Sequence, residues 1–216
     1  MSKVRVHSLT LSLDGYSSAP GQSREAPFGP GGHKIMEWFF PTDIWLSMQQ
    51  KEPGEKGVDN AEALKGYENI GAWILGRNMF APSRGPWTDD GWKGWWGPNP
   101  PYHVPTFVVT HHQHDPIVME GGTTFHFVTD GIRSALDQAK KAAGGKDVRI
   151  GGGATTVRQY LEAGLIDEAN LVISPVLLGA GESIFAGVDL AKAGYEVTRH
   201  RMGERALHVT LRKKKG

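Results

Sequence analysis

Alternation of apolar and polar residues recurs along the chain and predicts the strands of a sheet. The first such stretch covers residues 3–13, and its alternation slips once, near His7 and Ser8. Several later stretches are short apolar runs, as expected of buried strands. The predicted strands contain Val4, Ile74, Val108, Phe127, Ile150, Val172, Val197 and Val209.

Helical patterns lie between the later strands. Residues 130–143 predict a helix with one apolar face, residues 154–163 predict a second, and glycine follows each of them. Residues 195–212 favour a closing hairpin. Strands that alternate with helices and end in a hairpin predict an α/β fold, in which a mostly parallel sheet has an antiparallel edge. No repeat marks a second unit, so residues 1–216 are expected to form a single domain.

Two predicted helices nearer the N-terminus are less regular. Residues 33–50 are rich in apolar residues and favour a helix, which Pro41 is expected to break or restart. A short helix ending at Leu64 follows, and Asp59 or Asn60 is its expected cap.

Glycine and proline are abundant, with 29 and 13 residues, so loops take up much of the chain. The largest irregular segment is an insertion over about residues 81–105, which holds Trp87, Trp92, Trp95 and Trp96. This insertion is either a lid or ring-stacking platform over a site, or a satellite core of packed aromatic rings. A carbohydrate-binding surface is a less favoured alternative.

Charge and cysteine content exclude several classes of function. The formal net charge of +1 argues against nucleic-acid binding driven by overall charge, and the basic residues 212–215 fit a solvated tail. The absence of cysteine excludes disulfides, thiolate catalysis and zinc bound by cysteine. No apolar run approaches the ~20 residues that span a bilayer, so no membrane association is expected. With no signal-peptide core, the expected location is cytoplasmic.

The strongest candidate for ligand binding is the junction of a strand and a helix at Gly151, Gly152 and Gly153. Glycines let the backbone approach a ligand closely. A helix that begins at Ala154 and Thr155 offers unpaired N–H groups and a positive dipole end. These features favour binding of a pyrophosphate, and the alternative is a tight turn that holds no ligand.

Two further strand ends carry polar side chains at the expected carboxyl edge of the sheet, where α/β proteins bind ligands. Arg77 follows the strand that ends at Gly76, and its guanidinium suits a phosphate. Three histidines between residues 111 and 114 follow another strand. Adjacent histidines on an extended chain point in opposite directions, and no carboxylate-rich motif lies nearby. No metal site is therefore expected.

Six segments follow one another in a specific order. They are Leu11–Gly15, Ile74–Arg77, Phe107–Thr110, Ile150–Gly153, Leu165–Glu168 and Pro175–Glu182. Together they resemble the dihydrofolate reductase-like superfamily, and most closely its branch related to the reductase domain of the riboflavin-biosynthesis deaminase-reductases. The resemblance covers nearly the whole chain, and its specificity comes from the ordered set rather than from any single motif.

This resemblance implies an eight-stranded sheet flanked by helices, a bound NADPH, and hydride transfer to a pterin- or aminopyrimidine-like ring in a homodimer. The residues implied to bind the adenosine end of the cofactor are Gly76, Arg77, Asn78, Thr110 and His111. Those implied to hold its pyrophosphate are Gly151, Gly152, Gly153, Ala154 and Thr155. The backbone around Leu9 and Thr10 is implied to face the nicotinamide, and the loops over residues 16–32 and 81–105 are expected to border it.

The sequence departs from the family at the catalytic acid. Glu37 directly precedes Trp38 and does not align with the carboxylate that dihydrofolate reductases place on their first helix, so dihydrofolate is not the expected substrate. Asp14 is the preferred proton donor or substrate anchor, and a purely structural role in the turn is its alternative. Glu37 and Glu182 are further candidates.

The resulting hypothesis is an NADPH-dependent reductase that acts on a C–N or C=N group of a small heterocycle. The deaminase half of the riboflavin enzymes, with its zinc-ligating cysteines, has no counterpart here, so no second activity of that kind is expected. Two alternatives stay open. One is a non-catalytic NADPH- or small-ligand-binding protein of the same fold, and the other is a sugar-binding protein that uses the tryptophan insertion.

Overall fold

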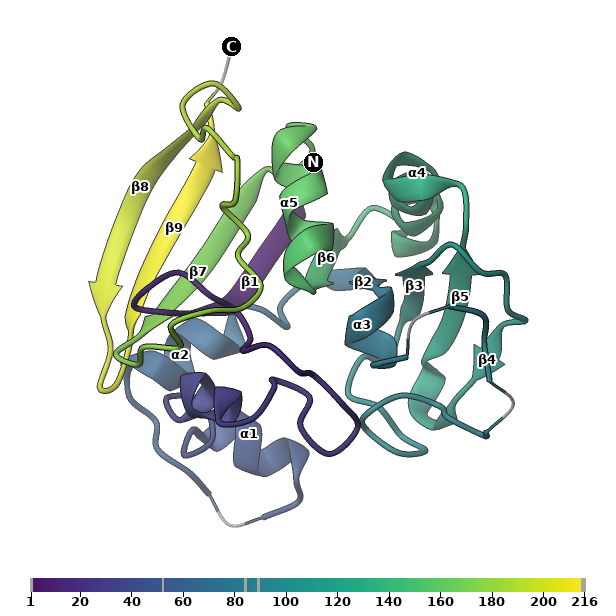
Figure 1. The fold of residues 1–216 in the computed structure, drawn as a ribbon, viewed down its shortest axis with the longest axis horizontal. Coiled ribbons are helices and arrows are strands. Elements are labelled where there is room, and N and C mark those ends of the chain that lie inside the picture. Colours follow the sequence, from purple (N-terminus) through teal and green to yellow (C-terminus); the bar gives the residue numbers. More distant parts are fainter. Residues whose placement is uncertain (1, 52, 84, 89, 215–216) are drawn as a thin grey trace.

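The computed structural model describes residues 2–51, 53–83, 85–88 and 90–214. Nine strands form one sheet in the order β4-β5-β3-β2-β6-β1-β7-β9-β8 (Figure 1). The strands are β1 Val4–Ser12, β2 Ile70–Gly76, β3 Pro105–Val109, β4 Ile117–Val118, β5 Thr124–Val128, β6 Asp147–Gly152, β7 Glu168–Ser174, β8 Tyr195–Met202 and β9 Leu207–Lys213. The helices are η1 Gly32–Met36, α1 Asp43–Met48, α2 Val58–Leu64, α3 Arg77–Phe80, η2 Glu120–Gly122, α4 Gly131–Ala143 and α5 Ala154–Glu162. None of the helices in these ranges is long and apolar enough to cross a membrane.

The sheet is parallel in its centre and antiparallel at both edges. The strands from β5 to β7 in the sheet order pair in parallel. At the edges, β4 pairs antiparallel with β5, and β9 pairs antiparallel with β7 and β8. The predicted α/β class with its C-terminal hairpin is therefore confirmed. All eight expected strands are present, and β4 adds a ninth, which is too short to show an alternation in the sequence.

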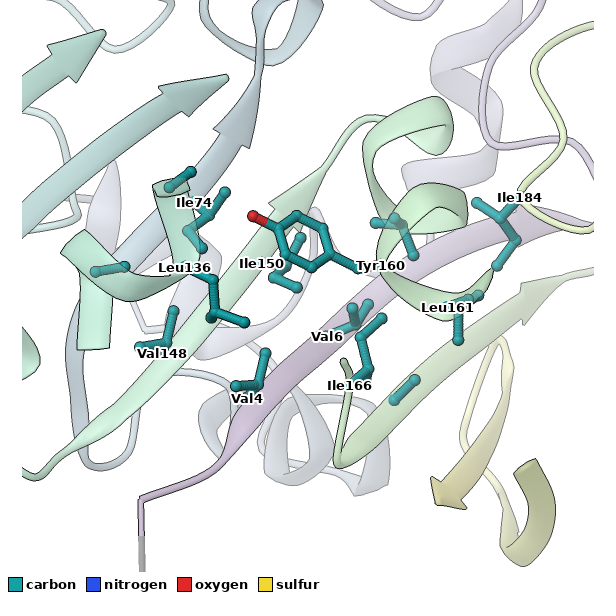
Figure 2. Packing of buried hydrophobic residues seen from close by; sticks show 14 of the residues in the cluster. Val4, Val6, Ile74, Leu136, Val148, Ile150, Tyr160, Leu161, Ile166 and Ile184 are labelled. Atoms are coloured by element: carbon teal, nitrogen blue, oxygen red, sulfur yellow. The ribbon is translucent and has the colours of Figure 1, made fainter. Parts of the chain in front are cut away.

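Helices α4 and α5 cover one face of the sheet and bury the main hydrophobic core against it. Val4 of β1 and Ile150 of β6 belong to this core. Figure 2 shows them in one cluster with Leu136 of α4 and Tyr160 of α5. The Tyr160 hydroxyl donates a hydrogen bond to the Ile132 carbonyl at 2.6 Å. This bond ties α5 to α4 and holds both helices in place over the sheet.

The opposite face carries two smaller hydrophobic clusters. Successive side chains of a strand point to opposite faces, so Trp73 and Leu75 of β2 lie on the face away from α4, where the 81–105 insertion packs. Val172 of β7 lies on the same face and packs with Trp38 beside α1 and α2. The insertion therefore forms part of a satellite core, and the space between the two clusters lies over the middle of the sheet.

The predicted helix over residues 33–50 is divided in two. η1 and α1 lie on either side of Pro41, so the expected break is confirmed. The side chain of Thr42 caps α1 by accepting a hydrogen bond from the Trp45 N–H at 3.4 Å. The segment between the two helices therefore ends at a side-chain cap.

The cap of α2 comes from a distant part of the chain. The Glu204 carboxylate accepts hydrogen bonds from the N–H groups of Val58 and Asp59 at 2.8 and 2.9 Å. The prediction that Asp59 or Asn60 caps this helix was therefore wrong. The Asp59 carboxylate is buried and accepts instead from the His208 ring at 2.7 Å, a contact between segments that lie far apart in the sequence.

Candidate functional site

A cavity of about 1310 Å³ lies between the two small clusters and reaches the carboxyl ends of β2, β3 and β6. Pockets for one small ligand measure ~300–1,000 Å³, so this cavity is larger than one such ligand requires. Its lining includes the predicted site residues Thr10, Gly76, Arg77, Asn78, Thr110, His111, Gly151, Gly153, Ala154 and Thr155. Gly152, Asp14 and Glu37 were also predicted and are not part of the lining.

The floor of the cavity forms where β1 and β6 part. β1 pairs with β6 only as far as Val6 and Ile150, and an irregularity between Val6 and Leu9 then shifts its register against β7. Ser8 lies in this bulge with a φ of 53°, and its buried Oγ has no hydrogen-bond partner within the described ranges. Bulges redirect side chains, and Ser8 here joins the cavity lining. Sequence analysis did not predict Ser8 as a site residue, although the slip in alternation was the signal.

The three glycines of the turn before α5 differ in whether, and why, the structure requires glycine at each position. A Cβ on Gly151 would lie 2.7 Å from a methyl group of Leu75. Gly152 has a φ of +120°, which residues with a side chain rarely adopt. A Cβ on Gly153 would meet only Met79, at 3.8 Å. Packing therefore does not require a glycine at position 153, and this residue lines the cavity.

Helix α5 begins at this turn without a side-chain cap. The N–H groups of its first turn have no acceptor within the helix, and they lie at the positive end of the helix dipole. Ala154, Thr155 and Thr156 of that turn all line the cavity. An uncapped helix start next to a glycine without a packing role can hold an anion such as a pyrophosphate.

Arg77 lies at the end of β2, in the cavity wall. Its guanidinium centre lies 3.0 Å from the ring centroid of Trp87, and its Nη2 donates to Ser83 Oγ at 3.1 Å. Its buried Nε has no hydrogen-bond partner, and no carboxylate in the part of the chain that the structure describes forms an ion pair with it. Burial lowers the pKa of this guanidinium. A partly desolvated cation without a counterion is suited to an anionic ligand. We call Arg77 and residues 153–155 the cationic end of the cavity.

The other end of the cavity is lined by aromatic rings from the insertion and α1. Trp96 of the insertion packs against Trp45 of α1, with ring centroids 5.7 Å apart. Tyr102 packs against Trp73 at 5.0 Å. Trp73 lies three residues before Gly76, the last residue of β2, which at ~3.3 Å per residue is ~10 Å along the strand from the end at which Arg77 follows. We call Trp45, Trp95, Trp96 and Tyr102 the aromatic end.

The loop over residues 16–32 contacts the insertion. Arg24 forms an ion pair with Asp90, and its guanidinium centre lies 4.7 Å from the ring centroid of Trp92. Both segments contribute to the cavity lining together with the triple-glycine turn. They therefore border the same cavity. That they border the nicotinamide of a bound cofactor stays a prediction.

Asp14, the preferred acid in the sequence analysis, serves the turn after β1. Its side chain is exposed and accepts a hydrogen bond from Ser12 Oγ at 2.5 Å. It also accepts from the N–H groups of Leu178 and Gly179 at 3.1 and 2.7 Å. These hydrogen bonds, that of Ser12 first, hold the pKa of Asp14 below its ordinary value. The observed contacts join two loops and lie outside the cavity lining.

Glu182 is the only Asp or Glu among the described residues that line the cavity. Its N–H donates to the Ser18 carbonyl at 3.1 Å, and its carbonyl accepts from the Ser17 N–H at 2.9 Å. The two bonds hold the half-buried Glu182 beside the loop that begins at residue 16. Glu37 is exposed and lies outside the lining.

The histidines after β3 take part in packing. The His112 carbonyl accepts from Trp87 Nε1 at 2.8 Å, and the His114 ring lies 4.6 Å from the Phe127 ring, between centroids. His111 lines the cavity beside Thr110. Throughout the ranges described, no group of three or more His, Cys, Asp or Glu is placed to hold a metal ion.

Solved structures of other proteins share this fold. A protein from Shewanella sp. PV-4 assigned to riboflavin biosynthesis has a TM-score of 0.60 and 19% identity, over 100% of both chains. The diaminohydroxyphosphoribosylaminopyrimidine deaminase/5-amino-6-(5-phosphoribosylamino)uracil reductase from Thermotoga maritima has a TM-score of 0.57 and 10% identity, over 99% of this chain and 57% of its own. At these identities the likeness shows the fold alone.

Comparison of sequences shows the family. The uncharacterized protein YyaP of Bacillus subtilis (strain 168) is 39% identical over 62 residues, which are 29% of this chain and 32% of that protein. The alignment thus spans about a third of this relative. The family model of the RibD C-terminal domain matches residues 3–211. The chain therefore belongs to the RibD C-terminal domain family.

Proposed function

We propose that this protein is an NADPH-dependent reductase that acts on a C–N or C=N group of a small pterin- or aminopyrimidine-like ring. One observation carries the proposal. A single cavity, larger than one small ligand requires, joins an anion-binding end, built from Arg77 and the start of α5, to an end lined with aromatic rings. The Thermotoga maritima relative with this fold is named as a reductase of an aminouracil compound, which supports the same class of reaction.

The residues at the cationic end fit NADPH. The open side of Gly153 and the N–H groups of Ala154 and Thr155 would hold the pyrophosphate. Arg77 would bind the 2′-phosphate through its guanidinium together with Thr110, whose Oγ1 lies 3.5 Å from Arg77 Nη1. Bound NADPH supplies a hydride.

The remaining predicted cofactor residues are proposed to contact the adenosine or the nicotinamide. Asn78, His111 and Gly76 line the cavity beside Arg77, where we propose that the adenosine binds. Thr10 lies on the floor and accepts a hydrogen bond from Trp38 Nε1 at 3.0 Å. Since Trp38 holds this side chain, we propose that Thr10 contributes through its backbone beside the nicotinamide.

Glu182 is the residue we propose as the proton-holding acid, in place of Asp14. Reduction of a C=N group requires a proton at nitrogen, and a general acid must reach the substrate. Glu182 lines the cavity, whereas the Asp14 carboxylate is occupied by Ser12, Leu178 and Gly179. The Glu182 carboxyl group would hold the proton at its Oε atoms.

Calorimetric titration of the purified protein with NADPH and with NADH tests the cofactor, and NADPH oxidation with pterins, aminopyrimidines and quinones tests the reaction. We expect binding of NADPH and turnover with a pterin or an aminopyrimidine. Binding without turnover of any compound would instead support a non-catalytic binding protein. A protein without affinity for either nucleotide contradicts the proposal.

The proposed enzyme acts as a homodimer in the cytoplasm. The edge strand β8 exposes Val197 and Met202, at 59% and 69% of their surface, and a second copy is the partner that we expect there. Light scattering measures the mass in solution, and a monomer at micromolar concentration contradicts the dimer.

A further inference from the structure

The two ends of the cavity differ in charge. Arg77 is the only lysine or arginine among the described lining residues, and it belongs to the cationic end. The aromatic end is surrounded by Met36, Met48 and the amide side chains of Gln49 and Gln50. None of the described lining residues at this end carries an ammonium or guanidinium group. The buried Arg149 guanidinium lies 4.2 Å from the Trp73 ring centroid, outside the lining, and donates to the carbonyls of Gly66 and His7.

Two cations lie in the loops next to the aromatic end without lining the cavity. Arg24 forms an ion pair with Asp90 and stacks on Trp92, so its charge is already paired. Lys93 is exposed and is not part of the lining. Neither of these residues therefore offers a free charge at the aromatic end.

We propose that the substrate is a planar ring without a phosphate group, bound against Trp45, Trp95 and Trp96. This inference rests on the proposed function, because that function assigns Arg77 to the cofactor. The uracil compound named for the Thermotoga maritima relative carries a phosphoribosyl group. A phosphate in a partly buried site requires charge-assisted donors, and among the described residues that line the aromatic end only the exposed His103 ring could supply one. The substrate of this chain therefore differs from that compound.

The residues at the aromatic end match the needs of a flat, polar-edged ring. Tryptophan rings offer stacking surfaces for any ring with a π face. The amides of Gln49 and Gln50 supply donors and acceptors for polar groups at the ring edge. Few polar groups in a mostly apolar wall are typical of specific sites for neutral ligands.

Riboflavin and riboflavin 5′-phosphate are suitable probes, because they share one ring and differ only by a phosphate. Titration with NADP⁺ present at saturation, followed by flavin fluorescence, measures both affinities. We expect riboflavin to bind about tenfold more tightly than its phosphate. Equal or tighter binding of the phosphate overturns the inference, and so does the absence of binding by both compounds.

Two variants locate the ring. Trp96→Ala should weaken riboflavin binding about tenfold and leave the affinity for NADPH unchanged, and Trp96→Phe should restore most of the loss. Arg77→Gln should weaken NADPH binding and leave the affinity for riboflavin unchanged. Unchanged riboflavin affinity in Trp96→Ala places the ring elsewhere and overturns the inference.

A third variant supplies the missing charge. Gln49→Arg should raise the affinity for riboflavin 5′-phosphate about tenfold relative to the affinity for riboflavin, compared with the wild type. An equal gain for both probes, or no gain for the phosphate, contradicts the inference. Separate titration with NADPH distinguishes a failure of this inference from a failure of the proposed function. If NADPH does not bind but the flavin probes behave as expected in its absence, the cofactor assignment is wrong and the phosphate-free ring site stands.

Discussion

The cationic end and the aromatic end of the cavity are built in different ways. The cationic end uses regular elements: Arg77 comes directly after β2, and the turn at Gly153 joins β6 to α5. Its residues are short-range neighbours of predicted strands. The aromatic end brings Trp45 of α1 against Trp96 of an irregular insertion. Residues that belong to strand ends are placed by the sheet itself, whereas the aromatic rings depend on the packing of loops.

This difference suggests that the cationic end tolerates little change in sequence, whereas the aromatic end can change. Sheet geometry fixes the cationic end, because Gly76, Gly151 and Gly152 are required by packing or backbone conformation. The aromatic end lies in loops, which tolerate changes of length and composition better than strands do. We therefore expect substrate preference to change with the insertion and nucleotide binding to depend on the sheet.

The largest expected effect concerns the proposed acid, Glu182, whose substitution should lower turnover without weakening cofactor binding. Glu182→Gln should lower kcat by ~10²- to 10⁴-fold, the usual contribution of a general acid, because the amide cannot supply a proton. The affinity for NADPH should stay the same. Steady-state kinetics and calorimetry measure the two quantities.

Asp14→Asn is the matched comparison for this acid. Asp14 accepts three hydrogen bonds that join loops outside the cavity, so its variant should lower the melting temperature and leave kcat nearly unchanged. A loss of kcat in Asp14→Asn as large as that in Glu182→Gln contradicts our assignment of the acid.

The next effect tests whether Gly153 leaves space for a ligand at the cationic end rather than meeting a packing requirement. Gly153→Ala should weaken NADPH binding by ~10- to 100-fold, because a methyl group would occupy the space left for the pyrophosphate. Its stability should be unchanged or higher by ~0.4–1 kcal/mol, since a Cβ at this position meets only Met79. Denaturant unfolding and calorimetry provide the two measurements.

Gly76→Ala is the control for this prediction. A Cβ on Gly76 would overlap Thr156 Oγ1, so this variant should lose ~1–3 kcal/mol of unfolding free energy. Full NADPH affinity in a folded Gly153→Ala variant would show that the open side of this glycine is not a ligand site.

A smaller effect concerns the choice of nucleotide. A charge-assisted contact contributes ~1.5–3 kcal/mol, so wild-type protein should bind NADPH ~10- to 150-fold more tightly than NADH. Arg77→Ala should remove most of this preference and leave the affinity for NADH nearly unchanged. A preference that survives the substitution would transfer the role to His111 and His112, and equal affinities in the wild type would refute the preference itself.

The smallest effect, taken over one pH unit, is a pH dependence of stability that arises from His7 of β1. Burial, followed by the charge of Arg149, lowers the pKa of His7 from 6.5 to about 3 in the folded protein. Its Nε2 lies 2.7 Å from the Glu62 carbonyl. Because the unfolded state binds the proton more readily, stability is complete above pH ~6.5 and is lost as the pH falls towards 3.

Comparison with a variant isolates this contribution. Between pH ~6 and 5, His7 alone should lower the unfolding free energy by up to ~1.4 kcal/mol per pH unit. His7→Gln should show a shallower slope by that amount, measured by denaturant unfolding at each pH. Identical slopes in both proteins would mean that His7 does not remain neutral in the folded state.

Local patterns were sufficient for the strands and for the cationic end. The alternation and apolar runs predicted eight of the nine strands, and the strand-to-helix glycines predicted the uncapped start of α5. The failures were contacts between distant segments. The cap of α2 comes from Glu204, and the hydrogen bonds of Asp14 come from Leu178 and Gly179. No local pattern contains such partners.

The sequence by itself determined the α/β class, the edge of the sheet that the cavity reaches and the position of Arg77 at that edge, because strand periodicity and the direction of parallel strands are local properties. Only the tertiary structure decided that the bulge at Ser8 brings this residue into the cavity lining, that Glu182 is an acidic residue of that lining, and that Trp45 meets Trp96. These outcomes depend on which loops pack together, and that packing is set by the shape and burial of side chains far apart in the chain.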